Sequence, residues 1–129
     1  MVAMKRLDHL VLTVADVART ITFYEAIGME AFTFDGRWAL RFGQSKINLH
    51  QRGHELEPHA GSVTPGSSDM CFVVAGPMDD VVADLRRAGL TIELGPLQRT
   101  GALGPMESVY LRDPDGNLVE LAVYPDTVA

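Results

Sequence analysis

The chain has 129 residues, a formal net charge of -6 and 47% hydrophobic residues, which is an ordinary composition for one globular domain. Acidic and basic residues are interspersed, so the clustered Lys and Arg that a nucleic-acid or anionic-membrane surface needs are missing. Cys71 is the single cysteine, which excludes an intrachain disulfide and a cysteine-based zinc site. Since no apolar segment approaches the roughly 20 residues that span a bilayer, we expect a cytoplasmic protein that binds neither nucleic acid nor membrane.

Residues 6–51 have the pattern of one β-α-β-β-β module. Residues 7–14 are rich in apolar and β-branched side chains and predict a buried strand. Asp16 is a good N-cap for the helix that follows, and Gly28 suits the left-handed residue after its end. Three short strands are then expected at residues 30–34, 37–42 and 46–51.

The same pattern starts again after residues 52–67, whose Pro, Gly and Ser content predicts a loop that links two modules. Residues 68–125 predict the second module, with a helix that begins at Pro77. Its strands are expected at residues 69–74, 90–94, 108–112 and 118–124. Residues 95–106 contain several Gly and Pro and predict a long loop, which is a candidate lid over a ligand.

Four polar residues interrupt the apolar strands at matching places in the two modules. Superposing the first strands places His9 opposite Asp69, and superposing the last strands places His50 opposite Glu120. Pseudo-twofold packing of the modules would bring all four together as ligands of one divalent metal ion, with Zn, Ni, Mn and Fe(II) as candidates. The alternative is that each His is a core or interface residue and each carboxylate is solvated. A shared metal would remove the cost of burying four polar groups separately.

Three motifs carry a resemblance to a known family. They are Leu-Asp-His-Leu-Val-Leu-Thr-Val at residues 7–14, Phe23-Tyr24 followed by Ile27-Gly28-Met29, and Arg-Asp-Pro-Asp-Gly-Asn-Leu-Val-Glu at residues 112–120. With these motifs the chain resembles the glyoxalase, bleomycin-resistance and extradiol-dioxygenase superfamily, the vicinal oxygen chelate proteins, over essentially its whole length. Residues 57–58, 65–67 and 95–102 are similar to a subgroup of short proteins called glyoxalase domain-containing protein 5.

The resemblance implies an α+β fold in which two tandem β-α-β-β-β modules form an open barrel-like cleft, commonly in a homodimer. It also implies one divalent metal ion, which is chelated by two neighbouring oxygens of a small-molecule substrate and stabilises an enolate or a related intermediate. His9 and Glu120 match the family's ligands best. His50 stands where the family often has Glu or Gln, and Asp69 stands where it usually has His.

Two enzymatic functions are compatible with this resemblance. The first is a glyoxalase-type, metal-dependent lyase or isomerase with Glu120 as ligand and base, although Thr13 stands where a glutathione-binding Arg is expected. The second is an extradiol dioxygenase using Fe(II) and a catechol, with Tyr110 as a catalytic residue. The upstream His of the dioxygenase signature is absent, and His54 or His59 would have to replace it.

A third function is non-catalytic binding of a ligand or an antibiotic, as in bleomycin-resistance proteins. Trp38 would then supply a stacking surface, whereas an aromatic residue in a strand is more often part of the core. Arg99 and Arg112 are candidates for holding an anionic group of a substrate, although surface Arg residues are common.

Overall fold

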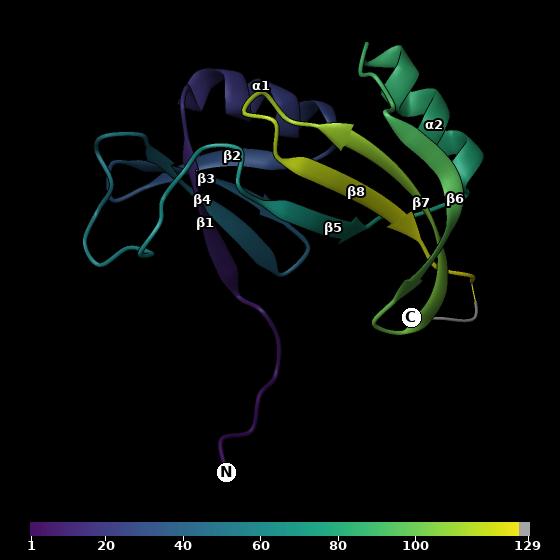
Figure 1. Ribbon diagram of the computed structural model, residues 1–129, viewed down its shortest axis with the longest axis horizontal. Coiled ribbons are helices and arrows are strands. Elements are labelled where there is room, and N and C mark those ends of the chain that lie inside the picture. The colour runs from purple at the N-terminus through teal and green to yellow at the C-terminus, as the bar shows by residue number, and fades with distance from the viewer. Residues whose placement is uncertain (127–129) are drawn as a thin grey trace. The chain divides into compact units, whose positions relative to one another are not determined.

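The structure is a computed structural model that describes residues 1–126, and the chain divides into two compact units between Gly66 and Ser67. Each unit consists of one helix and one four-stranded mixed sheet (Figure 1). The expected α+β class is therefore confirmed. Neither sheet closes into a barrel within residues 1–126. No helix in this range is long and apolar enough to cross a bilayer.

Unit 1 follows the predicted order of elements. It contains β1 (His9–Val14), α1 (Val17–Ala26), β2 (Glu30–Phe34), β3 (Arg37–Phe42) and β4 (Ser45–Gln51). The order of strands in the sheet is β1-β4-β3-β2, with β1 parallel to β4 and the remaining pairs antiparallel. The first and last strands of the module are thus direct neighbours, with β1 at one edge of the sheet.

The predicted signals at the two ends of α1 are confirmed. The Asp16 carboxylate accepts a hydrogen bond from the Arg19 amide at 3.1 Å, as an N-cap does. Gly28 follows the helix with a φ of 105°, a conformation that is strained for residues with a Cβ. Phe23 and Tyr24 bury the inner side of α1 against the sheet.

Unit 2 repeats the same topology. It contains β5 (Asp69–Val73), α2 (Met78–Arg87), β6 (Leu94–Gly101), β7 (Gly104–Arg112) and β8 (Leu118–Val123). The strand order is β5-β8-β7-β6, with β5 parallel to β8, so every pairing has its counterpart in unit 1. The duplication predicted from the sequence is therefore confirmed at the level of sheet topology.

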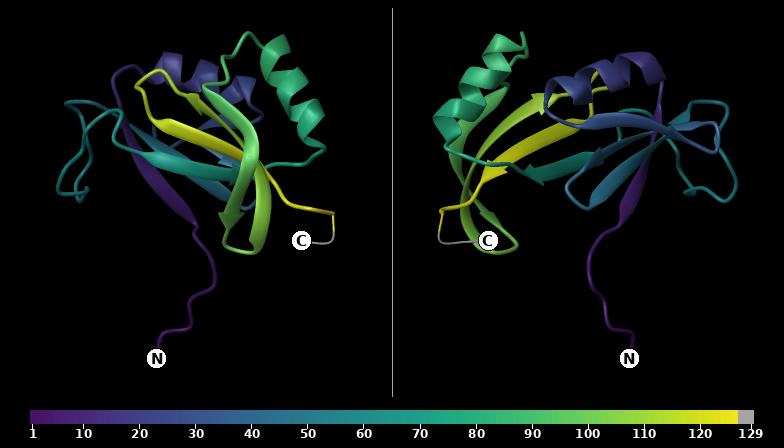
Figure 2. Two further views of the ribbon diagram at one scale, coloured as in Figure 1. Left: turned by 45° about the vertical axis from the view of Figure 1, so that its right-hand side comes forward. Right: turned by 180° about the vertical axis from the view of Figure 1, so that it is seen from behind.

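In each unit, the helix covers one face of the sheet (Figure 2). Side chains alternate between the two faces of a strand, and the buried apolar members face the helix. These members are Leu12, Val14, Leu40, Ile47 and Leu49 in unit 1, and Val109, Leu111, Val119 and Leu121 in unit 2. The opposite face of each sheet is called the open face below.

The prediction of a lid at residues 95–106 is wrong, and so is the strand predicted at residues 90–94 apart from its last residue. This segment forms β6, a two-residue turn and the start of β7. Pro96 is tolerated because β6 is an edge strand, where a missing N–H removes no bond from the interior of the sheet. A register shift between Leu94 and Leu97, together with Gly95 at a φ of 103°, accommodates the proline.

Candidate functional site

The open face of unit 1 carries His9 at its N-terminal edge. The Nδ1 atom of His9 lies 2.8 Å from the carboxylate of Asp8, and this hydrogen bond holds the pKa of Asp8 below its usual range. A histidine whose Nδ1 is fixed by a carboxylate has Nε2 oriented for a ligand, which is the usual arrangement around metal-binding imidazoles. His9 therefore fits its predicted role by its local contacts.

His50 does not lie beside His9 on this face. In the parallel pair of β1 and β4, His9 is level with Lys46, and His50 is four positions further along β4, level with Thr13. At a rise of about 3.3 Å per residue, the Cα atoms of the two histidines are roughly 13 Å apart along the strand direction. Since the donors of one metal ion lie within about 2.2 Å of it, His9 and His50 of one unit are too far apart to share an ion.

The strand register also corrects the superposition of the last strands. Glu120 is level with Cys71 on β5. The counterpart of Cys71 in unit 1 is Val11 on β1, and Val11 is level with Asn48 on β4. The counterpart of Glu120 in unit 1 is therefore Asn48, not His50. In both units the pair has the same spacing, because Asn48 lies two positions beyond the level of His9 and Glu120 lies two positions beyond that of Asp69.

Asn48 is a further candidate site residue, which the sequence-based prediction did not include. Its Oδ1 atom is buried and has no hydrogen-bond partner, which is uncommon for a buried polar atom. The signal for its role was present in the sequence, since Ile47-Asn48-Leu49 and Val119-Glu120-Leu121 share an apolar-polar-apolar pattern. Aligning these triplets, rather than residues 48–50 with residues 118–120, gives the observed register.

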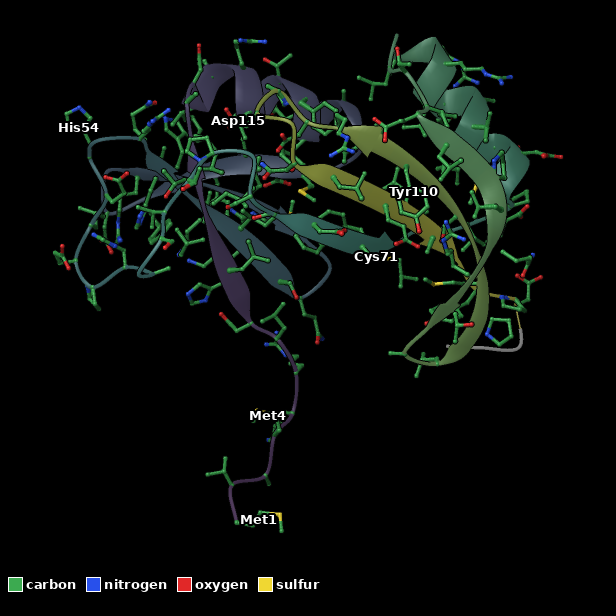
Figure 3. The ribbon with its side chains drawn as sticks, viewed as in Figure 1. Met1, Met4, His54, Cys71, Tyr110 and Asp115 are labelled. Carbon is green, nitrogen blue, oxygen red and sulfur yellow. The ribbon has the colours of Figure 1, made fainter. Side chains whose placement is uncertain are left out.

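The open face of unit 2 is organised around Glu120. Its Oε2 atom accepts a hydrogen bond of 2.6 Å from the hydroxyl of Ser108, which is fully buried on β7. Cys71 lies level with Glu120 on the neighbouring strand β5 (Figure 3). Desolvation, followed by the negative charge of Glu120, raises the pKa of the Cys71 thiol to about 11, so the thiol is protonated at neutral pH.

Tyr110 and Arg99 form the second part of this open face. Tyr110 is directly opposite Glu120 in the antiparallel pair of β7 and β8. The Nε of Arg99 donates to the hydroxyl oxygen of Tyr110 at 2.8 Å, and the guanidinium carbon lies 5.5 Å from the centre of the tyrosine ring. The Tyr110 oxygen thus accepts from Arg99 and retains its own hydrogen for donation to a ligand.

The remaining predicted residues lie elsewhere. Asp69 is exposed at the start of β5, and Trp38 lies on β3 of unit 1 with 44% of its surface exposed. Arg112 donates from Nε and Nη2 to the carboxylate of Glu93 at 3.0 and 3.2 Å, and from Nη1 to the Gly116 carbonyl at 3.1 Å. Its guanidinium therefore ties the end of β7 to the two flanking loops.

The donor chemistry of these residues fits a divalent metal ion. In unit 1, His9 offers an imidazole nitrogen and Asn48 an amide oxygen, and in unit 2, Asp69 and Glu120 offer carboxylate oxygens, which are donors that Mn and Fe(II) accept. Within residues 1–126, neither unit on its own groups three His, Cys, Asp or Glu side chains closely enough to hold one ion. The convergence of ligands from both modules that the sequence suggested stays a prediction.

The sequence model of the Glyoxalase/Bleomycin resistance protein/Dioxygenase superfamily matches residues 6–121. Because this match spans most of the chain and the two units repeat one β-α-β-β-β topology, the protein belongs to this superfamily.

Proteins similar to this chain come from several organisms. Virulence protein STM3117 of Salmonella typhimurium is 54% identical over 121 residues, which cover 92% of this chain and 84% of that protein. Its crystal structure has a TM-score of 0.93 at 52% identity and covers 96% of this chain and 100% of that one. Glyoxalase domain-containing protein RDO1 of Mycosarcoma maydis is 49% identical over 125 residues, or 96% of this chain and 71% of that protein.

Proposed function

We propose that the protein is a metal-dependent lyase or isomerase of the glyoxalase type, which acts in the cytoplasm, as a homodimer, on a small molecule with two neighbouring oxygens. The observation that carries this proposal is the cluster on the open face of unit 2. There, Glu120 is held by Ser108 at 2.6 Å and faces Tyr110, which is bound to Arg99. A carboxylate, a hydroxyl and a guanidinium on one rigid sheet face are the groups that proton transfer next to a carbonyl needs.

Each residue of the cluster has a definite task in this proposal. The carboxylate of Glu120 takes a proton from the carbon that bears one of the two oxygens and is bonded to the carbonyl carbon, and Ser108 fixes the orientation of that carboxylate. The hydroxyl of Tyr110 donates a hydrogen bond to a substrate oxygen that becomes negatively charged. Arg99 holds Tyr110 in place and attracts a substrate that carries an anionic group.

A divalent metal ion bound by His9, Asn48, Asp69 and Glu120 would supply positive charge to the substrate oxygens. His50 is left out of this proposed ligand set because of its distance from His9 along the strands. If Glu120 is both ligand and base, its replacement removes both functions, whereas replacement of a ligand that is not a base lowers metal affinity alone.

The test measures enolisation directly. The protein, purified without added metal, is analysed for its metal content and then incubated in heavy water with a panel of hydroxyketones and hemithioacetals. Proton NMR follows the exchange of the carbon-bound hydrogen for deuterium. We expect exchange with the metal-loaded protein and a loss of at least about a hundredfold in Glu120→Gln, since removing a positioned general base typically costs about 10²–10⁴-fold in rate.

Glu107→Gln is the matched control, because Glu107 lies on β7 of the same sheet but points to the face opposite that of Ser108. Ser108→Ala should lower the metal affinity or the rate by about ten- to a hundredfold, as for other groups that orient a ligand. Retention of both metal and exchange activity in Glu120→Gln would refute the proposal. Oxygen consumption with catechols would instead assign the dioxygenase function.

A further inference from the structure

Two positive charges of unit 1 meet at one aromatic ring on the open face of the sheet. Arg37 on β3 is directly opposite Phe34 on β2, so their side chains lie on the same face. Lys46 on β4 is opposite Arg41, which is on the same face of β3 as Arg37, whereas the buried Ile47 next to Lys46 faces the helix. The guanidinium carbon of Arg37 lies 4.7 Å from the centre of the Phe34 ring, and the Nζ atom of Lys46 lies 3.8 Å from it.

Neither of these charges is neutralised by a close carboxylate. Arg37 makes one long ion pair of 3.8 Å with Asp35, whose side chain is 83% exposed. Lys46 makes no ion pair with any of residues 1–126. The carboxylate of Asp8, which precedes the neighbouring strand β1, is instead engaged by His9 at 2.8 Å. Because a long and exposed ion pair contributes little, both positive charges are available to a ligand.

The shared aromatic neighbour keeps the two charges close together. Since both lie near the centre of the Phe34 ring, their separation cannot exceed the distances of 4.7 and 3.8 Å taken together. Two like charges at such a separation repel each other, and an anion in contact with both replaces this repulsion by attraction. Solvent reaches the two groups, because 38% of the Arg37 side chain is exposed and Lys46 is half-buried.

A second arginine on the same face has similar surroundings but also a carboxylate partner. Arg41 stacks on Phe32 at 3.8 Å and pairs with Glu30 at 3.4 Å. Glu30 is directly opposite Arg41 in the pairing of β2 with β3, so their charges offset each other. The ring of Phe32 lies 6.0 Å from that of Phe34, so this ion pair is a neighbour of the unpaired charges. The contrast supplies an internal control for the role of charge.

We infer that Arg37 and Lys46 form a binding site for the phosphate group of a small phosphorylated molecule. Such a group carries a charge of about −1.5 to −2 at neutral pH and three acceptor oxygens, so one phosphate can contact both cations. A carboxylate has one charge and two oxygens, which a guanidinium alone satisfies in a bidentate pair. The site goes beyond the proposed enzymatic function, since it lies within unit 1 and uses none of His9, Asn48 and Glu120.

The test is a titration of the ¹⁵N-labelled protein with inorganic phosphate, followed by the NMR signals of the backbone amides and of the arginine Nε–H groups. Sodium chloride keeps the ionic strength constant, because salt screens exposed charges. The net charge of -6 repels anions from the chain as a whole, so saturable binding requires a local site. We expect a saturable shift of the Arg37 signal and a dissociation constant of about 1 mM, which is within reach of a ligand with so few atoms. Acetate should bind at least about tenfold more weakly, because it carries a smaller charge.

Matched variants locate the charges that bind phosphate. Arg37→Gln and Lys46→Gln should each weaken binding by at least about tenfold, the loss typical of one hydrogen bond to a charged group. Arg41→Gln removes the same charge from an existing ion pair and should change the affinity by less than about threefold. Lys46→Arg keeps the charge and should bind within about threefold of the native protein. Equal weakening by the three glutamine variants would show general charge attraction and overturn the inference.

Two controls separate this site from the proposed enzymatic function. Glu120→Gln and chelator-treated protein should both bind phosphate as the native protein does, whereas loss of binding after chelation would assign the phosphate to a metal ion and overturn the inference. Circular dichroism verifies that each variant is folded, and if Arg37→Gln is not, the comparison of Lys46→Gln with Lys46→Arg decides. The absence of a saturable shift in the native protein, or equal binding of acetate, would likewise overturn the inference.

Discussion

Two asparagines with opposite surroundings allow a sharp prediction about stability. Asn117 in unit 2 is 1% exposed, and its Nδ2 atom donates to the carboxylate of Asp113 at 2.7 Å. Its Oδ1 atom accepts a hydrogen bond from the Ser68 amide at 2.8 Å. Asn48 in unit 1 has a buried Oδ1 atom without a partner. The side-chain amides of Asn117 and Asn48 should therefore contribute very differently to the free energy of unfolding.

The magnitude follows from the hydrogen bonds that each substitution removes. Asn117→Ala loses one bond to a charged group, worth about 1.5–3 kcal/mol, and one to a backbone amide, worth about 1 kcal/mol, so we expect a destabilisation of about 3 kcal/mol. Asn48→Ala removes an acceptor that was buried without a partner, which offsets the lost packing. For this variant we expect a change below about 1 kcal/mol.

Urea unfolding followed by circular dichroism measures both variants under the same conditions. A similar loss of stability in the two would refute the reasoning, as would a loss below about 1 kcal/mol in Asn117→Ala. If Asn48→Ala is neutral in stability but lowers metal affinity, its unpartnered oxygen is retained for binding at a cost in stability.

Two further predictions concern the titration of single groups. At pH 8, Cys71 should react with iodoacetamide about a hundredfold more slowly than a thiol with the ordinary pKa of 9.0, because the pKa of Cys71 is about 11. Glu120→Gln should speed the reaction, since it removes a nearby negative charge that raises this pKa. Mass spectrometry follows the alkylation, and a rate equal to that of free cysteine would contradict the raised pKa of Cys71. The hydrogen bonds from Arg112 hold the pKa of Glu93 below its ordinary value of 4.5, so the pair stabilises the fold at neutral pH and this contribution disappears as the pH falls through the lowered pKa. Glu93→Gln should therefore be less stable than the native protein at pH 7 and equally stable in acid. Urea unfolding at several pH values measures this, and a difference in unfolding free energy that stays the same at every pH would contradict the prediction.

The fold could be predicted from local signals. Asp16 and Gly28 mark the two ends of α1, and the apolar runs at the strands recur in the same order in both modules. These signals depend on neighbouring residues, so a single sequence contains them. The prediction was wrong for residues 95–106, which are rich in Gly and Pro. A strand containing Pro96 is possible there because β6 lies at the edge of the sheet.

The site could be predicted only in part, because strand register is not a local property. Glu120 and His9 were proposed from their positions in apolar runs, and their role stays a prediction. Asn48 was missed because its neighbours are set by the pairing of β4 with β1. These two strands are separated in the chain by α1, β2 and β3, so the register of the pair cannot be read from either segment. Likewise, the contacts of Arg112 with Glu93 join residues that are 19 positions apart, and nothing in either segment predicts them.

Strand β6 has a consequence for how unit 2 behaves among other chains. A free sheet edge is a template for adding further strands, and long regular edges promote aggregation. Pro96 offers no N–H for such pairing, and the irregular register between Leu94 and Leu97 bends the strand away from a regular ladder. The feature that made this segment resemble a loop in the sequence thus disfavours the addition of a further strand at β6, whereas β5, the other end of the strand order within the described residues, contains no proline.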